Sequence, residues 1–307
     1  MALRIVHGWQ GLAPDQRGAA LAYGNFDGVH GGHQQVIKAA GEAAAKLGAP
    51  FAVSSFEPHP RRWFQPDAEP FRLMTVDQQA RALAALGVDL FYVLPFDADM
   101  AEMSDEAFAR RVLSEGLGVR HVSVGFDVTF GKGRTGDPAA LTRYGGRFGF
   151  TVSITEPVGD SGLERYSSSA VREALQTGHP ERAAEILGRC FAIEGDVVRG
   201  QQLGRTLGFP TANVALADYV IPRLGVYATR TRVPDGREFQ GAANLGRNPT
   251  TGLVEPRLEV FLFDFDEDIY GQVIETELIR FIRPELKFDS LDAMIEQMRK
   301  DCEEARR

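Results

Sequence analysis

The sequence has few cysteines, no excess of basic residues and no long apolar run. Its two cysteines, Cys190 and Cys302, are too few for a disulfide framework and lack metal-type spacing. The 34 lysines and arginines are outnumbered by 42 aspartates and glutamates, and the net charge of −8 argues against a general nucleic-acid binder. No stretch approaches the roughly 20 apolar residues of a membrane span, and the start lacks the apolar core of a signal peptide. We expect a cytoplasmic protein with neither nucleic-acid nor membrane partners.

The first half of the chain alternates short apolar runs with amphipathic segments. The strand-like runs are 20–24, 51–56, 90–94, 121–126 and 150–155. Helix-like segments are expected at 32–47, 75–86, 104–115, 138–144 and 169–176. Alternation of this kind predicts an α/β domain of Rossmann type, with a parallel sheet covered by helices on both faces.

After residue 188 the helical segments stop until the C-terminus. Six strand-like segments follow one another: 191–198, 212–216, 225–233, 237–246, 257–265 and 272–282. This pattern predicts a small antiparallel six-stranded barrel, and the periodicity of 291–305 predicts a final helix packed on it. The expected domains are 1–185 and 186–307.

Glycines and histidines crowd the segment GNFDGVHGGH (24–33), between the first strand and the first helix. Glycine permits positive φ and close approach of a ligand, and a helix N-terminus offers free amides and a positive dipole to phosphate. His30 and His33 are three residues apart, so both rings can face one anion. The glycine order matches neither GxGxxG nor GxxxxGK[ST]. The alternative is a glycine-rich turn with two surface histidines.

The segment resembles the HxGH signature of the nucleotidyltransferase superfamily in its longer form GxFDGxHxGH. The resemblance implies that His30 and His33 hold the triphosphate of ATP and stabilise charge as pyrophosphate leaves. The other expected ATP-binding residues of the motif are Gly24, Phe26, Asp27 and Gly28. Whether Asp27 shapes the turn or faces the nucleotide stays open.

A second motif, YSSSAVR (166–172), resembles the ISSTxxR motif with which this superfamily grips the phosphates from the other side. It implies ATP contacts from Ser167, Ser168, Ser169 and Arg172. The chain departs from the motif at Tyr166 and Ser169, and Ala170 stands where some relatives carry a further arginine. A serine N-cap followed by a solvated arginine is the alternative.

Two segments between these motifs, SFEPHP (55–60) and VGFDVTFGKGRTGD (124–137), resemble the FAD synthetase branch of the superfamily. The resemblance implies flavin contacts from Pro58, His59, Asp127 and Arg134, with Lys132 as a further candidate. Val128 replaces a usual aromatic. A charged, glycine-rich surface loop is the alternative, and His59 could be structural.

The segment GQQLGRTLGFPTANV (200–214) resembles the riboflavin kinase motif around GxPTAN. By this resemblance Thr211 and Asn213 ligate the Mg²⁺ that accompanies ATP, and hard oxygen ligands suit this ion. The expected ATP-binding residues are Gly200, Gly204, Gly208, Pro210 and Thr211. Taken alone, PTAN is a plausible structural turn.

Glu259 lies in the segment RLEVFLFDFDEDIYG (257–271). In a strand it would share a face with Phe261, Phe263 and Phe265, where burial would raise its pKa and suit a general base. In riboflavin kinases a glutamate at the matching place deprotonates the ribityl 5′-hydroxyl, and the resemblance makes Phe261 a flavin contact. Pairing of Glu259 with Arg257 is the alternative. Thr251 departs from a common PTFG form.

Together the motifs resemble bacterial bifunctional riboflavin kinase/FAD synthetases along nearly the whole chain. The resemblance implies that the C-terminal domain phosphorylates riboflavin to FMN with MgATP. The N-terminal domain would then adenylylate FMN to FAD and release pyrophosphate. Two alternatives stay open: a single active domain, or a non-catalytic flavin-binding regulator. The sequence leaves the oligomeric state undetermined.

Overall fold

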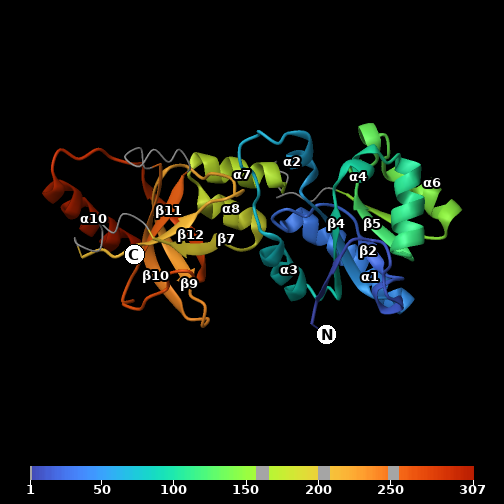
Figure 1. Cartoon of the computed structure of the whole chain (residues 1–307), viewed down its shortest axis with the longest axis horizontal. Helices are drawn as coiled ribbons and strands as arrows, with labels where there is room; N and C mark the ends of the chain where they lie inside the picture. The colour runs from blue at the N-terminus through green and yellow to red at the C-terminus, as the bar shows by residue number, and fades with distance from the viewer. Residues whose placement is uncertain (1, 157–165, 200–207, 248–255) are drawn as a thin grey trace. The chain divides into compact units, whose positions relative to one another are not determined.

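A computed structural model describes residues 2–156, 166–199, 208–247 and 256–307 (Figure 1). By its contacts the chain divides into two compact units. The first contains Met1–Ala68 and Val76–Tyr166, and the second contains Glu69–Thr75 and Ser167–Arg307. The short segment Glu69–Thr75 therefore belongs to the second unit although the first unit surrounds it in the sequence.

The first unit is built on a six-stranded parallel sheet. Its order is β1-β4-β3-β2-β5-β6, and every pairing is parallel. The strands are β1 (Arg4–His7), β2 (Ala20–Ala22), β3 (Phe51–Glu57), β4 (Leu90–Pro95), β5 (His121–Gly125) and β6 (Thr151–Thr155). The predicted parallel α/β fold is confirmed, and β1 is an edge strand that the sequence analysis missed.

The helices of this unit follow the predicted alternation with one change of type. The regular helices are α1 (Gly31–Leu47), α2 (Pro60–Phe64), α3 (Val76–Ala85), α4 (Ala98–Glu102) and α6 (Pro138–Phe148), with short 3-10 turns η1 (Pro14–Gln16) and η3 (Lys132–Arg134). The expected helix at 104–115 is instead a short α5 (Asp105–Ala107) that continues as the π-helix η2 (Phe108–Gly116). Phe108, Val112 and Leu113 of η2 are buried in the core of the sheet.

The second unit contains a closed barrel in the order β10-β11-β8-β7-β12-β9. Its strands are β7 (Phe191–Val198), β8 (Ala212–Ala215), β9 (Gly225–Arg232), β10 (Glu238–Gly246), β11 (Arg257–Leu262) and β12 (Val273–Arg283). All pairings are antiparallel, so the predicted six-stranded barrel is confirmed. β11 is shorter than expected, because the chain turns at Asp264, whose φ is +59°.

The helices of this unit among the described residues are α7 (Ser168–Thr177), α8 (Pro180–Leu187) and α10 (Leu291–Ala305). α8 packs against α7, β7 and β12, and α10 packs against β9, β10 and β12, as predicted for the final helix. Charged pairs fasten α10, including a bidentate pair of Arg283 with the buried Asp301 at 2.6 and 2.8 Å. Among the residues placed by the structure, no helix is both long and apolar enough to cross a bilayer.

Candidate active sites

The turn before α1 has an unusual backbone. Phe26, Gly28 and Val29 have φ of 49°, 91° and 45°, and positive φ is strained for an aromatic and especially for a β-branched residue. Of the four glycines in this motif, which are all described, only Gly28 has a positive φ. Gly32 is required for space, because a Cβ there would lie 3.0 Å from the backbone oxygen of Tyr166. Positive φ and close approach, the two properties expected of these glycines, are thus used at Gly28 and Gly32 respectively.

His30 and His33 are brought together at the start of α1. His30 is the N-cap, and its Nδ1 accepts a hydrogen bond from the backbone N–H of His33 at 3.3 Å. The two rings are stacked with centroids 3.5 Å apart, and His33 also meets Phe26 edge-on at 5.2 Å. Because Nδ1 of His30 accepts, the neutral ring carries its proton on Nε2, where it can donate to an anion. Asp27 and His30 are buried.

A large pocket of about 880 Å³ adjoins this turn in the first unit. Aromatic side chains form much of its wall, from Tyr23, Phe56, Phe64, Phe96, Phe108 and Phe130. They contact one another, for example Tyr23 with Phe108 at 5.3 Å and Phe108 with Phe130 at 5.8 Å between ring centroids. Arg61, Lys132 and Arg134 add positive charge. A pocket with aromatic walls and cations at its edge suits a flat, anionic ligand.

The pocket collects some of the predicted flavin residues and omits others. His59, Arg134 and Lys132 line it, as do Val128 and Gly24, whereas Pro58 and Asp127 are not among its lining residues. The sequence analysis missed most of its aromatic wall. Tyr23 directly follows β2, Phe56 lies on β3, Phe64 ends α2, Phe96 follows β4, Phe108 begins η2 and Phe130 lies in the loop after β5, so only the folded unit brings them together.

The serine motif forms the start of α7 in the second unit. Ser167 is the N-cap and accepts a hydrogen bond from the N–H of Ala170 at 3.1 Å, while Ser168 and Ser169 begin the helix. Nε of Arg172 donates to the backbone oxygen of Phe71 at 2.7 Å, and its guanidinium lies over the Phe71 ring. His30 and His33 belong to the other unit, so the joining of both motifs at one ATP stays a prediction.

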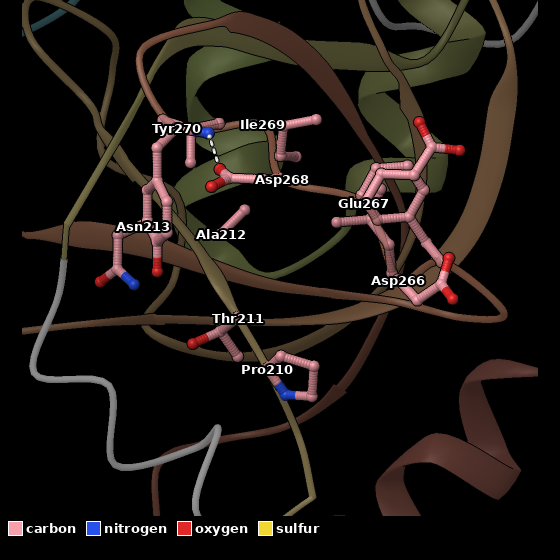
Figure 2. Close-up of a pocket in the computed structure, with 12 residues that line it drawn as sticks. Pro210, Thr211, Ala212, Asn213, Asp266, Glu267, Asp268, Ile269 and Tyr270 are labelled. Atoms are coloured by element: carbon pink, nitrogen blue, oxygen red, sulfur yellow. Dashed lines mark hydrogen bonds between the residues drawn. The ribbon is translucent and has the colours of Figure 1, made fainter.

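A second pocket, of about 290 Å³, lies on the barrel around the PTAN segment (Figure 2). Pro210, Thr211 and Asn213 line it from one side. The loop after β11 lines it from the other, with Phe265, Asp266, Glu267, Asp268, Ile269 and Tyr270. Within this loop Asp268 accepts a hydrogen bond from the N–H of Tyr270 at 2.9 Å, which is the dashed line in Figure 2. The sequence analysis did not assign this acidic loop to a site.

Glu259 is the register partner of Asn213. β11 pairs with β8 so that Glu259 faces Asn213 directly, and β10 places Asn244 opposite Glu259 on the other side. Side chains of directly opposed residues project from the same face of a sheet. The predicted base and one predicted metal ligand are therefore neighbours, although 46 residues separate them in the sequence.

Burial raises the pKa of the Glu259 carboxyl above its usual range, and the nearby Arg257 opposes this shift more weakly. Within the described ranges, no side chain forms a hydrogen bond or ion pair with this carboxylate. Phe261 contacts Phe209 at 5.4 Å and Phe263 at 5.7 Å between centroids. Phe263 and Phe265 lie beyond the end of β11, so the expectation that all three phenylalanines share its face is wrong.

The structure says little about some of the predicted kinase residues. Gly200, Gly204 and Thr251 lie outside the described residues. Gly208 is exposed with φ of +83°, which a glycine adopts without strain.

Comparisons with known proteins match two families along the chain. Residues 12–170 match the family model described as FAD synthetase, and residues 187–307 match the model described as riboflavin kinase. The bifunctional riboflavin kinase/FMN adenylyltransferase of Haemophilus influenzae is 40% identical over 99% of this chain and 98% of its own length. The Escherichia coli K12 protein of the same name is 39% identical over 97% and 96%. The chain belongs to the bifunctional riboflavin kinase/FMN adenylyltransferase family.

Membership confirms the family inferred from the motifs, and both catalytic domains occur in the predicted order. Among solved structures, one titled as a macrolide-efflux protein from Streptococcus pneumoniae is similar with a TM-score of 0.85. It is 30% identical and the match covers 98% of each chain. That title describes the other protein; the likeness here is one of fold and sequence.

Proposed function

We propose that this chain converts riboflavin to FAD in two ATP-dependent steps, with residues 186–307 responsible for the first and residues 1–185 for the second. In the first step the ribityl 5′-hydroxyl attacks the γ-phosphorus of ATP, Glu259 accepts its proton, and ADP leaves. In the second step an oxygen of the FMN phosphate attacks the α-phosphorus of another ATP, and pyrophosphate leaves. Neither step requires a protein nucleophile, so positioning and charge stabilisation carry the catalysis.

The observation that best supports the kinase step is the direct pairing of Glu259 with Asn213. A half-buried carboxylate with a raised pKa, and with no ion-pair partner among the described residues, is costly unless it is used. Its neighbour Asn213 lines the same pocket as Thr211. A base beside a phosphate site is the arrangement that phosphoryl transfer to a hydroxyl needs.

Enzymes of this family that use ATP generally require a divalent metal, and Mg²⁺ is our specific proposal. The Thr211 hydroxyl and the Asn213 amide oxygen would hold it, since Mg²⁺ prefers hard oxygen ligands and keeps waters and phosphate oxygens as the rest of its shell. When bound, the ion would neutralise charge on the phosphates. Asp266 and Asp268 add negative potential at the same pocket.

The adenylylation step is supported by the His30/His33 pair and the aromatic pocket that adjoins its turn. Nε2–H of His30 and the free amides of α1 are donors suited to phosphate oxygens that gain charge as pyrophosphate leaves. The aromatic walls suit the isoalloxazine ring, and Arg61, Lys132 and Arg134 suit the dianionic FMN phosphate. Contacts from Ser167, Ser168, Ser169 and Arg172 to the same ATP complete the proposal.

Product analysis tests both steps. The purified chain is incubated with riboflavin, ATP and Mg²⁺, and the flavins are separated by chromatography. FAD is expected; FMN alone would leave only the kinase, and unchanged riboflavin would contradict the proposal and favour a binding protein.

Paired variants test the assignment of one reaction to each domain. Glu259→Ala should abolish FMN formation while FMN supplied directly still becomes FAD, and the double variant His30→Ala/His33→Ala should do the reverse. Glu277→Gln, on the barrel, and the exposed His7→Ala are matched controls that should keep both activities. A folded variant that loses both reactions would contradict the assignment.

A further inference from the structure

The loop 129–136 carries two of the cations that line the aromatic pocket. Phe130 and Gly136 exchange backbone hydrogen bonds of 3.1 and 2.9 Å, which closes the loop into a tight hairpin. Three of its residues, Gly131, Gly133 and Arg134, have positive φ of 75°, 67° and 59°. Arg134 is not a glycine, so its conformation is strained and must be imposed by the surroundings.

Asp105 lies against this loop from the start of α5. Its Oδ1 accepts a hydrogen bond from Thr135 Oγ1 at 3.2 Å, and its Oδ2 accepts one from the Tyr144 hydroxyl of α6 at 2.9 Å. The bond to Asp105 is also the main reason why the pKa of Tyr144 is raised. A single carboxylate thus joins the loop to the helix that follows it.

The backbone of the loop also packs closely against Asp105. A Cβ on Gly131 would lie 2.5 Å from Cα of Asp105, and one on Gly136 would lie 2.8 Å from its Cβ. Just before Asp105, the backbone oxygen of Met103 accepts a hydrogen bond from the N–H of Lys132 at 2.8 Å. Backbone and side-chain contacts therefore press the loop onto one short segment, residues 103–105.

The two cations on the pocket side, Lys132 and Arg134, have few other restraints. Lys132 and Arg134 are exposed, Lys132 pairs with the exposed Glu102, and Arg134 Nε donates to Thr129 within the same loop at 2.9 Å. Exposed pairs of this kind contribute little to order. The orientation of both cations toward the pocket therefore depends on the anchoring at residues 103–105.

We propose that Asp105 is a positioning residue for FMN adenylylation, which holds the loop 129–136 so that Lys132 and Arg134 meet the anionic flavin substrate. This inference rests on the proposed function of the first unit and assigns a role to a residue outside the motifs. Asp105 acts through Thr135 and the loop backbone and does not itself contact the substrate. Its loss should weaken FMN binding much more than ATP binding.

The test measures adenylylation kinetics with FMN and ATP varied separately, and FMN binding through flavin fluorescence. Asp105→Ala should raise KM and Kd for FMN about tenfold, as expected for the loss of one or two hydrogen bonds that order the loop. KM for ATP should stay within about twofold, and riboflavin phosphorylation should not change. Asp105→Asn should recover most of the FMN affinity, because an amide can accept from Thr135 and donate to the Tyr144 oxygen.

Thr135→Val and Asp99→Ala complete the design. Thr135→Val leaves the Asp105–Tyr144 bond in place and removes the Thr135 hydroxyl, which contacts both Asp105 and, at 3.3 Å, the backbone oxygen of Lys132. It should give part of the same FMN effect, so it carries the test where Asp105→Ala does not fold. Asp99→Ala, an exposed aspartate on α4, is the matched control and should match the wild type. Unchanged FMN affinity in folded Asp105→Ala or Thr135→Val, or equal losses for FMN and ATP, overturns the inference alone. A wild-type chain that makes no FAD from FMN overturns the proposed function and the inference with it.

Discussion

Replacing Glu259 by glutamine separates a catalytic base from a structural ion pair. Glutamine has nearly the same shape as glutamate but cannot accept the hydroxyl proton. Removal of a general base lowers the rate by roughly 10²–10⁴, or about 3–5 kcal/mol in activation free energy. We therefore expect kcat for riboflavin phosphorylation to fall by about that factor, with little change in KM for ATP.

The same variant has an opposite expected effect on stability. Burial raises the pKa of Glu259, so the folded state binds this proton more tightly than the unfolded state does. At pH values above the ordinary pKa of 4.5 the unfolded chain gains from ionisation, and the carboxylate thus lowers the free energy of unfolding at neutral pH. Glu259→Gln removes this cost, so its melting temperature at pH 7 should equal or exceed that of the wild type.

Discontinuous assays of FMN formation measure the predicted loss in kcat, and thermal melts at pH 7 measure the predicted effect on stability. Glu277→Gln, which removes a surface partner of Arg230, is the control and should leave kcat unchanged. A Glu259→Gln protein with a loss in kcat below tenfold would refute the role as a base. A clear drop in melting temperature would instead support the ion pair with Arg257.

Two further predictions concern stability. Asp301→Ala should lower the free energy of unfolding by about 3 kcal/mol and the melting temperature by about 6–12 °C, because it leaves Arg283 without its buried partner. The control is Asp264→Ala, which removes the exposed partner of Arg306 and should lower the free energy of unfolding by at most about 1 kcal/mol. Burial lowers the pKa of His121 below 6.5, so as the pH falls the unfolded chain binds this proton before the folded protein does. The urea midpoint should therefore fall as the pH drops below 6.5. This fall should be smaller in His121→Asn, and an equal fall in both proteins would contradict the reasoning.

The fold was largely predictable because its strands have strong local patterns. In the barrel, β11 and the first half of β12 alternate buried with more exposed residues, and in the parallel sheet β2 and β4 are short apolar runs. β1 escaped because only Val6 of its four residues is buried, which leaves no periodic signal. The π-helix escaped for another reason: residues 108–116 read as an ordinary amphipathic helix, and nothing in their spacing indicates the wider turn.

The sites were predictable only where chemistry is concentrated in a short motif. His30 and His33 lie three residues apart on one helix start, so their proximity follows from local geometry. The pairing of Glu259 with Asn213 depends on strand register, and the anchoring of Thr135 by Asp105 joins residues 30 apart. Such contacts are set by tertiary packing, which the hydrophobic periodicity and motif spacing of a sequence do not predict.

The histidine motif shows how backbone geometry and chemistry depend on each other. A strained turn at Phe26, Gly28 and Val29 leads directly into the N-cap His30, whose Nδ1 is occupied by the N–H of His33. That bond leaves Nε2 of His30 as the donor, and it stacks both rings at the positive end of α1. In the proposed adenylylation, a ring that donates from Nε2 suits phosphate oxygens whose charge increases as pyrophosphate leaves. Strain that would only destabilise a structural turn is understandable under our proposal, in which the turn places these rings beside the triphosphate.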